Sequence, residues 1–196
     1  MNFVDKRLVT KAKEGDTQAF AELITQYKDK IFNLAYRMLG NIQEAEDVSQ
    51  DTFIRVYTNL GRYDDQHKFS TWIFRIATNL AIDRMRKKKA DFSLDANWDQ
   101  EEGTDWHSKL ADPKNGPEEE VVAKEMEDTI QQAIMSLPPK YRSIMVLRYL
   151  EDLSIQEISQ IVHLSESTVK TRLHRGREAL RKQLIEKGRS GQNEMS

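Results

Sequence analysis

The sequence has no cysteine among its 196 residues, and this absence excludes several kinds of chemistry. Without a thiol the chain can form no disulfide, offer no thiolate nucleophile and bind no metal through sulfur. Its four histidines show no paired spacing of the kind that holds a metal ion. We therefore expect no metal, no redox centre and no other cofactor.

Long apolar runs are missing as well. No window approaches the roughly 20 consecutive apolar residues of a membrane-spanning helix, and the polar beginning MNFVDKRLVTKAKEGD lacks the apolar core of a secretion signal. We therefore expect a cytoplasmic protein. Apolar residues make up 38% of the chain and charged residues 32%, so it can fold into one or two domains with small cores.

No single sign of charge dominates, because the net charge of −2 is the sum of large opposite contributions. Five basic side chains gather in RMRKKK at 84–89, and seven Lys or Arg stand against three Glu over 165–187. Between these segments, residues 91–124 hold ten acids against three lysines. This segregation indicates two basic patches that can meet a phosphate-bearing partner, with an acidic stretch between them.

Apolar residues recur at steps of three and four through most of the chain, which predicts an all-α fold. The first long helix is expected over 17–39, where Gly40 ends it and Asn41 caps the next helix. After a polar loop, GRYDDQHKF, Ser70 is expected to cap a third helix that ends in the basic cluster. Residues 90–117 lose the period and gather Asp, Glu, Gly and Pro, so we interpret them as a linker between two domains.

The third predicted helix has two sides that differ in composition. The side expected to dock it on the first two helices consists of Ile73, Ile76, Ala77 and Leu80. Arg75, Thr78 and Ile82 point away from that side, flanked by Phe74 and Met85. Aromatic and apolar groups beside an arginine indicate a surface that meets a partner. The alternative is that this face packs against another helix of the same domain.

Two capping signals mark a helix-turn-helix near the C-terminus. Ser154 and Glu157 form a capping box that opens a short helix, and Ser165 can cap a longer basic helix after a brief turn. A solvated helix face would interleave acids with its bases, whereas Glu178 is the only acid over 167–182. The second helix of such a motif enters the DNA major groove. The residues expected to contact bases or phosphates are Ser167, Thr168, Lys170, Thr171, His174, Arg175 and Arg177.

Four segments, in order, resemble a known family. The chain resembles bacterial RNA polymerase sigma factors of the extracytoplasmic-function (ECF) group in EAEDVSQDTFIRVYTNL, KFSTWIFRIATNLAIDRMRKKK, LPPKYRSIMVLRYLEDLSIQEIS and TVKTRLHRGREAL. The resemblance implies two small helical domains, with sigma region two at 1–90 and sigma region four, containing the helix-turn-helix, at 118–187. It also implies a flexible acidic linker at 91–117 and a disordered tail at 188–196.

The resemblance also implies roles for particular residues. The segment EDVSQDTF corresponds to the surface that docks on the clamp helices of the polymerase's largest subunit, through Asp47, Gln50, Asp51 and Phe53. The loop and third helix correspond to the part that melts and reads the minus-ten element, where aromatic rings stack on bases. The residues implied there are Tyr63, Phe69, Trp72, Phe74, Arg75, Asn79, Arg84, Arg86 and Lys87. Trp72 could equally be a core residue, and the acids of the docking segment could be ordinary exposed helix residues.

Region four, by the same resemblance, reads the minus-thirty-five element with its basic helix. Gly176 departs from the family there, because Ala often fills this position and glycine costs about 1 kcal/mol in helix propensity. The function implied is that of a dissociable sigma factor that directs core RNA polymerase to promoter DNA. The resemblance also implies an anti-sigma factor, anchored in the membrane, and a cell-envelope stress regulon. It implies no enzymatic activity and no small-molecule substrate for the chain itself.

Two other functions compete with this interpretation. A stand-alone helix-turn-helix regulator would bind a palindromic operator as a dimer, without polymerase. A nuclease or helicase would need a metal-carboxylate cluster or a phosphate loop of the form G-x-x-x-x-G-K, and the sequence shows neither. A monomeric mass would count against the first rival, and absence of catalysis with added Mg²⁺ against the second.

Overall fold

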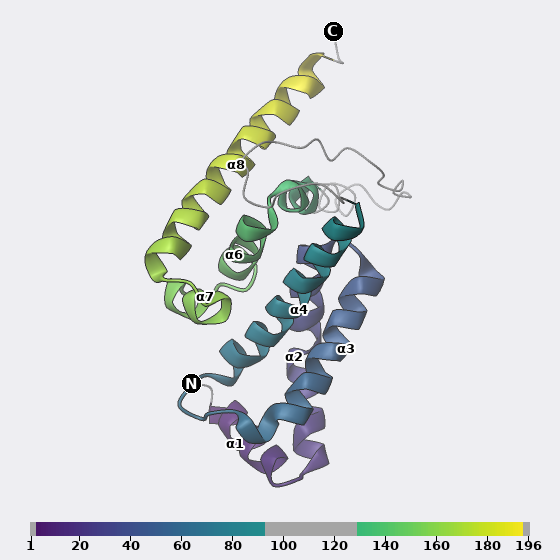
Figure 1. The fold of residues 1–196 in the computed structure, drawn as a ribbon, viewed down its shortest axis with the longest axis vertical. Coiled ribbons are helices and arrows are strands. Elements are labelled where there is room, and N and C mark those ends of the chain that lie inside the picture. Colours follow the sequence, from purple (N-terminus) through teal and green to yellow (C-terminus); the bar gives the residue numbers. More distant parts are fainter. Residues whose placement is uncertain (1–2, 93–128, 194–196) are drawn as a thin grey trace, which may run out of the picture.

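The structure is a computed structural model that describes residues 3–92 and 129–193. Every regular element within those two ranges is a helix (Figure 1), so the expected all-α fold is confirmed there. The predicted linker lies outside the described residues, except for its first positions, which continue a helix. None of the described helices combines the length and the apolar character of a membrane span.

The N-terminal unit consists of four helices, three of which pack around the fourth, α2. These are α1 (Phe3–Lys13), α2 (Thr17–Leu39), α3 (Ile42–Asn59) and α4 (Phe69–Phe92), with a short 3-10 turn, η1 (Leu60–Arg62), between α3 and α4. The apolar stripe predicted for α2 is buried, and α2 packs against α1, α3 and α4. The buried residues of this unit are therefore centred on α2.

Capping residues set the helix boundaries in this unit. Gly40 ends α2 in the left-handed conformation, with a φ of 68°, which glycine adopts without steric cost. Asn41 caps α3 by accepting a hydrogen bond from the backbone N–H of Glu44 at 2.9 Å. Both predictions are confirmed. The cap predicted at Ser70 is wrong, because α4 already begins at Phe69 and Ser70 lies within its first turn.

α1 is an element that the sequence analysis missed. Leu8 and Val9 bury its apolar side, and the carboxylate of Asp5, 6% exposed, anchors it to α2. The side chains of Gln26 and Tyr27 donate to Asp5 at 2.7 and 2.8 Å. Burial first, and then the contact with Asp5, raise the pKa of Tyr27. Few apolar positions mark so short a helix, and its period is therefore hard to recognise among charged residues.

The C-terminal unit contains the predicted helix-turn-helix. It consists of a helical segment at 129–136, α6 (Pro139–Tyr149), α7 (Ile155–Val162) and α8 (Glu166–Asn193). The capping box is formed, since Glu157 N–H donates to Ser154 Oγ at 3.2 Å and Ser154 N–H donates to Glu157 Oε2 at 3.0 Å. Helix α8 extends to Asn193, so the tail predicted from 188 begins as helix, because isolated glycines weaken a helix without ending it.

α4 is buried on two sides, where the sequence predicted one. Phe74, Thr78 and Met85 lie on the side expected to stay open, and all three are buried. The Sδ atom of Met85 lies 3.6 Å from Nη1 of Arg142 in α6, and α4 packs against α6 and α7 (Figure 1). Part of this face therefore packs against the other half of the same chain, at Met85, while Arg75 on the same face is only half-buried.

Polar contacts at the C-terminal end of α2 hold the two units together. The guanidinium of Arg142 donates to the carbonyl of Met38 at 2.8 Å and to the carbonyls of Met135 and Leu137. A cation is favourable at helix C-termini because their free carbonyls carry partial negative charge. Burial lowers the pKa of Arg142 to about 10, so this side chain stays protonated at neutral pH.

Gln131 and Met135 complete what we call the interdomain joint, formed by these two residues and Arg142 on the end of α2. Gln131 Nε2 donates to the carbonyl of Tyr36 at 3.3 Å. Met135 packs so closely on Gly40 that a Cβ added to the glycine would lie 2.8 Å from the methionine Cε. Gly40 thus allows the left-handed turn after α2 and also leaves room for Met135 of the C-terminal unit.

A further contact joins the units beside α7. Lys68 Nζ pairs with Glu157 Oε1 at 2.8 Å. Burial alone would raise the pKa of Glu157, but hydrogen bonds from Lys68 and Ser154 outweigh it and lower the pKa to about 2. Because the lysine is largely exposed, we expect this pair to contribute at most about 1 kcal/mol.

Candidate polymerase and nucleic-acid interfaces

An open pocket of about 320 Å³ lies where the end of α3 meets α4. Its lining combines guanidinium groups, side-chain amides and one indole ring. The lining residues are Arg55, Asn59, Arg62, Trp72, Arg75, Ile76 and Asn79. Such a set can donate hydrogen bonds to phosphates and base edges and can offer a ring face for stacking.

Helical spacing explains why these side chains gather. Trp72, Arg75 and Asn79 stand three and four positions apart and share one face of α4. Arg55 and Asn59 stand four apart at the end of α3, where Asn59 Nδ2 donates to the Arg55 carbonyl at 2.9 Å. The sequence analysis named the residues of α4 but missed Arg55, Asn59 and Arg62. The available signal was an arginine and an amide on one helical face, directly before the polar loop.

Three of the rings expected to stack on melted bases are buried. Tyr63, Phe69 and Phe74 are 5%, 3% and 4% exposed. Stacking needs an accessible ring face, and these three rings fill the core instead, so the structure corrects the expectation for them. An aromatic side chain in a polar loop can serve either purpose, and the sequence alone does not show which neighbours cover it.

Trp72 belongs to both the core and the pocket. Its ring centroid lies 5.0 Å from that of Tyr63 and 5.8 Å from that of Phe69, and Phe69 also packs edge-on against Tyr27. We call these four rings the aromatic cluster. Burial, and then the nearby carboxylates, raise the pKa of Tyr63 to about 12. The half-buried indole therefore rests on the cluster with one side and lines the pocket with the other.

The other predicted minus-ten residues lie outside the pocket, further along α4. Arg86 and Lys87 are exposed. Arg84 instead turns to α3, where Nη1 lies 3.0 Å from Asp47 and Nη2 lies 3.4 Å from Asp51. The hydrogen bond with Asp47 raises the pKa of Arg84, against the opposing effect of burial. The structure thus joins a residue predicted to hold DNA to two residues predicted to hold polymerase.

The predicted docking segment forms the outer face of α3. Asp47 and Gln50 are exposed, while Asp51 and Phe53 are half-buried. Beside them, two apolar side chains that the sequence analysis did not name, Ile54 and Tyr57, are each 60% exposed. Acids next to exposed apolar groups on one helix are suited to a protein interface.

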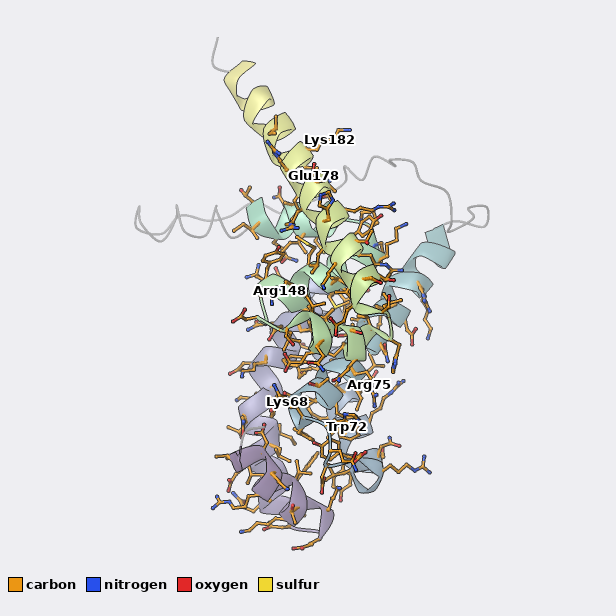
Figure 2. The ribbon with its side chains drawn as sticks, turned by 90° about the vertical axis from the view of Figure 1, so that its left-hand side faces the viewer. Lys68, Trp72, Arg75, Arg148, Glu178 and Lys182 are labelled. Atoms are coloured by element: carbon orange, nitrogen blue, oxygen red, sulfur yellow. The ribbon has the colours of Figure 1, made fainter. Side chains whose placement is uncertain are left out.

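The basic helix α8 presents its predicted residues to solvent. Val169 and Leu173 bury one side of the helix. On the other side, Ser167, Lys170, Thr171, His174, Arg175 and Arg177 are exposed, and Thr168 is half-buried. Figure 2 shows how α8 continues beyond the rest of the molecule, past Glu178 and Lys182. This face of α8 is therefore accessible to a DNA groove without any rearrangement of the C-terminal unit.

Packing explains the departure at Gly176. A Cβ at this position would lie 2.9 Å from Cγ and Sδ of Met145 in α6. Glycine therefore lets α8 approach α6 more closely than alanine would. The lower helix propensity of glycine is thus the cost of this close contact between α8 and α6.

Comparison with known proteins decides the family. Residues 23–90 match Sigma-70 region 2, and residues 127–180 match Sigma-70, region 4. The ECF RNA polymerase sigma factor SigW of Bacillus subtilis (strain 168) is 52% identical over 184 residues, which cover 94% of this chain and 98% of that protein. This chain belongs to the ECF RNA polymerase sigma factors.

More distant relatives support the same family. The RNA polymerase sigma-H factor of Pseudomonas aeruginosa is 35% identical to this ECF sigma factor. The match covers 92% of this chain and 93% of the sigma-H factor. Among solved structures, CnrH in complex with the cytosolic domain of CnrY has a TM-score of 0.69 at 21% identity, covering 93% of this chain and 97% of CnrH. RpoE of Bartonella quintana, with the anti-sigma factor NepR, has a TM-score of 0.61 at 18% identity, covering 85% and 96%. Both structures share its fold.

As a sigma factor, the protein binds core RNA polymerase and directs it to promoter DNA. The pocket and α3 lie within the match to region 2, and the exposed face of α8 lies within the match to region 4. Within the described residues, no cluster of three or more His, Cys, Asp or Glu could hold a metal ion.

Proposed function

We propose that this sigma factor holds a base of the melted minus-ten strand in the pocket between α3 and α4. The observation that carries the proposal is the lining, where the ring face of Trp72 lies with Arg75 and Asn79. Stacking of a base on an aromatic ring contributes about 1–3 kcal/mol. Arg55 and Arg62 are then available for the flanking phosphates. Arg86 and Lys87 extend the basic path along α4.

Region four, in this proposal, reads the minus-thirty-five element through the exposed face of α8. Lys170, Thr171, His174 and Arg175 reach base edges or adjacent phosphates, while Ser167, Thr168 and Arg177 contact the backbone. Support comes from their exposure on the second helix of a formed helix-turn-helix. The proposed limits are 1–90 for region two, 91–117 for the linker and 118–187 for region four.

Core polymerase docks on α3 in the same scheme, through Asp47, Gln50, Asp51 and Phe53. In the free protein Arg84 holds both carboxylates. A basic helical pair on the polymerase therefore competes with Arg84 for them. Docking would release this arginine on α4, C-terminal to the pocket, where it can serve the DNA strand.

An anti-sigma factor anchored in the membrane is the proposed negative regulator, and cell-envelope stress the proposed signal. The support is that RpoE was solved with the anti-sigma factor NepR, and CnrH with the cytosolic domain of CnrY. The site of action would be the cytoplasm, and the protein would have no catalytic activity of its own.

Run-off transcription with sigma-free core polymerase tests the two DNA surfaces. Trp72→Leu keeps an apolar side chain in the core but removes the indole, and Asn79→Ala removes a donor from the pocket. We expect each to lower initiation about tenfold, the equivalent of one lost stacking contact. Arg175→Ala should lower it on promoters that depend on the minus-thirty-five element.

Asp29→Ala is the matched control, because Asp29 is exposed on α2 and does not line the pocket. It should transcribe like the unchanged protein. Unaltered initiation with both Trp72→Leu and Asn79→Ala would show that the pocket does not hold the minus-ten strand. The Arg175→Ala result would then decide the role of α8 separately.

A further inference from the structure

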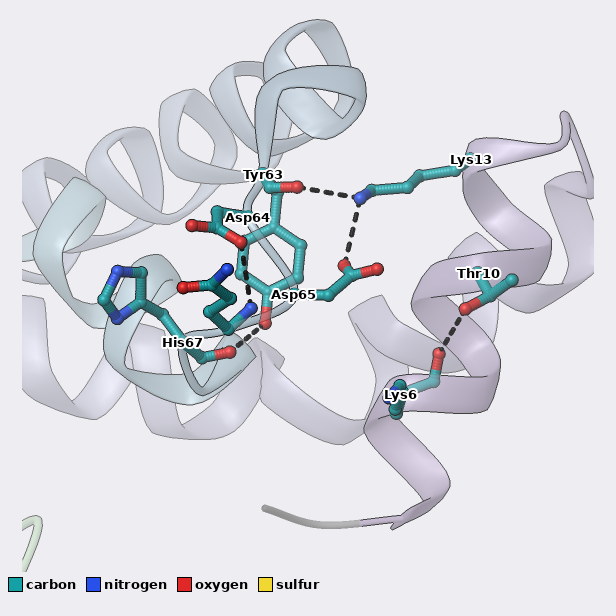
Figure 3. Close-up of polar contacts among 8 residues, drawn as sticks. Lys6, Thr10, Lys13, Tyr63, Asp64, Asp65 and His67 are labelled. Carbon is teal, nitrogen blue, oxygen red and sulfur yellow. Dashed lines mark hydrogen bonds and ion pairs between the residues drawn. The ribbon is translucent and has the colours of Figure 1, made fainter.

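The last residue of α1 reaches across to the loop that precedes the pocket wall (Figure 3). Lys13 Nζ donates to the carbonyl of Tyr63 at 2.7 Å and to Asp65 Oδ1 at 3.0 Å. The same ammonium lies 5.2 Å from the centre of the Tyr63 ring. Its side chain is only 25% exposed. One cation thus holds the backbone, an acid and a ring of the same short loop.

The loop itself is shaped by local contacts. Asp64 Oδ1 accepts from the backbone N–H of Gln66 at 3.0 Å, and the Tyr63 hydroxyl donates to the carbonyl of His67. These bonds fix the turn but do not fix where it sits on the molecule. Among the contacts described for this loop, those of Lys13 tie it to a separate helix.

The position of Tyr63 bears directly on the pocket. Arg62, its neighbour in the chain, lines the pocket, and the Tyr63 ring supports Trp72 at 5.0 Å. A shift of Tyr63 can therefore displace the guanidinium of Arg62 and the indole of Trp72, both of which line the pocket. Lys13 acts on the pocket through this tyrosine, without lining it.

α1 is fixed firmly enough to act as a support. Asp5 is buried against Gln26 and Tyr27, and Leu8 and Val9 are core residues. Tyr27 in turn packs edge-on against Phe69 of the aromatic cluster, at 5.5 Å. α1 therefore contacts the aromatic cluster at both of its ends. Near its start Asp5 accepts a hydrogen bond from Tyr27, and at its end Lys13 lies over the ring of Tyr63.

We propose that α1 sets the base preference of the minus-ten pocket, with Lys13 as the positioning residue that holds the loop at 63–67 and the pocket wall in place. The inference rests on the proposed function of the pocket. It adds a determinant outside the residues that match Sigma-70 region 2, which begin at 23. Lys13 itself contacts no base in this scheme.

Transcription from promoters that differ by single bases in the minus-ten element, with one fixed minus-thirty-five element, tests this role. Lys13→Met keeps the aliphatic stem but removes the charge and the donors. We expect the ratio between the preferred and the other bases to fall about fivefold to tenfold, the effect of losing one charge-assisted hydrogen bond. Lys13→Arg should restore most of the ratio.

Lys11→Met is the matched control, because Lys11 is exposed on the same helix, and it should leave the ratio unchanged. Asp65→Asn removes the acid that faces Lys13 and should shift the ratio in the same direction, less strongly. Amide hydrogen exchange of the loop should accelerate in Lys13→Met while that of the α2 core stays slow. This readout identifies a variant that has simply unfolded.

The outcomes separate the inference from the function on which it rests. If Trp72→Leu and Asn79→Ala alter base preference but Lys13→Met and Asp65→Asn do not, the positioning role is wrong and the pocket stands. An equal loss at every minus-ten sequence with Lys13→Met would also overturn it, since that marks a purely structural role. If the pocket variants leave initiation unchanged at every minus-ten sequence, the function of the pocket itself is wrong.

Discussion

At the scale of single residues, Arg142 links the end of α2 to the C-terminal unit, because its guanidinium bonds carbonyls on both sides. Replacing it with Met keeps much of its volume but leaves the carbonyls of Met38, Met135 and Leu137 without their donor. Each buried acceptor left without a partner costs about 1–3 kcal/mol. We expect Arg142→Met to lower the free energy of unfolding by about 2–4 kcal/mol, measured by urea denaturation.

Lys140→Met provides the comparison, because Lys140 is exposed two positions earlier on α6. It should change the free energy of unfolding by less than about 0.5 kcal/mol. A similarly small loss in Arg142→Met would mean that water or other donors reach the three carbonyls, and that the joint does not depend on the guanidinium.

Glu151 gives the protein a pH dependence of known sign. Burial raises the pKa of Glu151 from 4.5 to about 7, although the positive charge of Lys30 on α2 opposes the shift. The folded state therefore binds this proton more tightly than the unfolded state. Its stabilising effect is complete below about pH 4.5 and is lost as the pH rises through about 7.

Urea denaturation at about pH 5 and about pH 8 tests this effect against Glu151→Gln, which cannot titrate. Between these pH values the unchanged protein should lose about 1–2 kcal/mol relative to the variant, after allowance for solvent screening of the half-buried carboxyl. Parallel pH profiles for the two proteins would show that the carboxyl keeps its ordinary pKa in the folded state.

At the scale of elements, several helix caps could be predicted from sequence, whereas the covered faces of α4 could not. Gly40, Asn41 and the capping box of Ser154 and Glu157 act locally, so a few residues suffice to identify them. Which side of α4 is covered depends instead on residues more than fifty positions away, such as Arg142. The periodicity of α4 alone carries no information about that partner.

The candidate site divides in the same way. Trp72, Arg75 and Asn79 share a face through the geometry of one helix, and spacing predicted that correctly. Arg55 and Asn59 join them only because α3 and α4 pack side by side, which the pattern of either helix does not reveal. The burial of Tyr63 likewise depends on neighbours from other helices.

The outer face of α3 yields a prediction about docking. Asp47→Lys reverses a charge on an exposed position, where it also meets Arg84. We expect the affinity for core polymerase to fall at least about tenfold in a competition assay, because like charges then face the basic docking surface. The helical circular dichroism signal should stay unchanged.

Glu46→Lys makes the same change of charge one position earlier, on another exposed part of α3. It should reduce the affinity much less than Asp47→Lys. Equal losses would indicate a general electrostatic effect without a specific contact at Asp47.

At the scale of the whole molecule, the buried residues of both units form one continuous core. The arrangement leaves the exposed basic face of α8 open while it covers part of the second face of α4. One polar group in the covered region is unmet: the hydroxyl of Thr78 is fully buried and has no hydrogen-bond partner. Such a group costs about 1–3 kcal/mol, so the packing around α4 is not optimal at this position.

The contacts of Lys13 with the loop at 63–67 bear on which part of the chain can be exchanged between sigma factors as a unit. A chimaera that takes residues 23–90 alone would combine the pocket with a foreign first helix, without Asp5 and Lys13. A graft that begins at residue 3 carries the pocket together with α1, which contains Asp5 and Lys13. If the pocket holds the minus-ten strand as proposed, the smallest segment that transfers this function includes α1 as well as the residues that match Sigma-70 region 2.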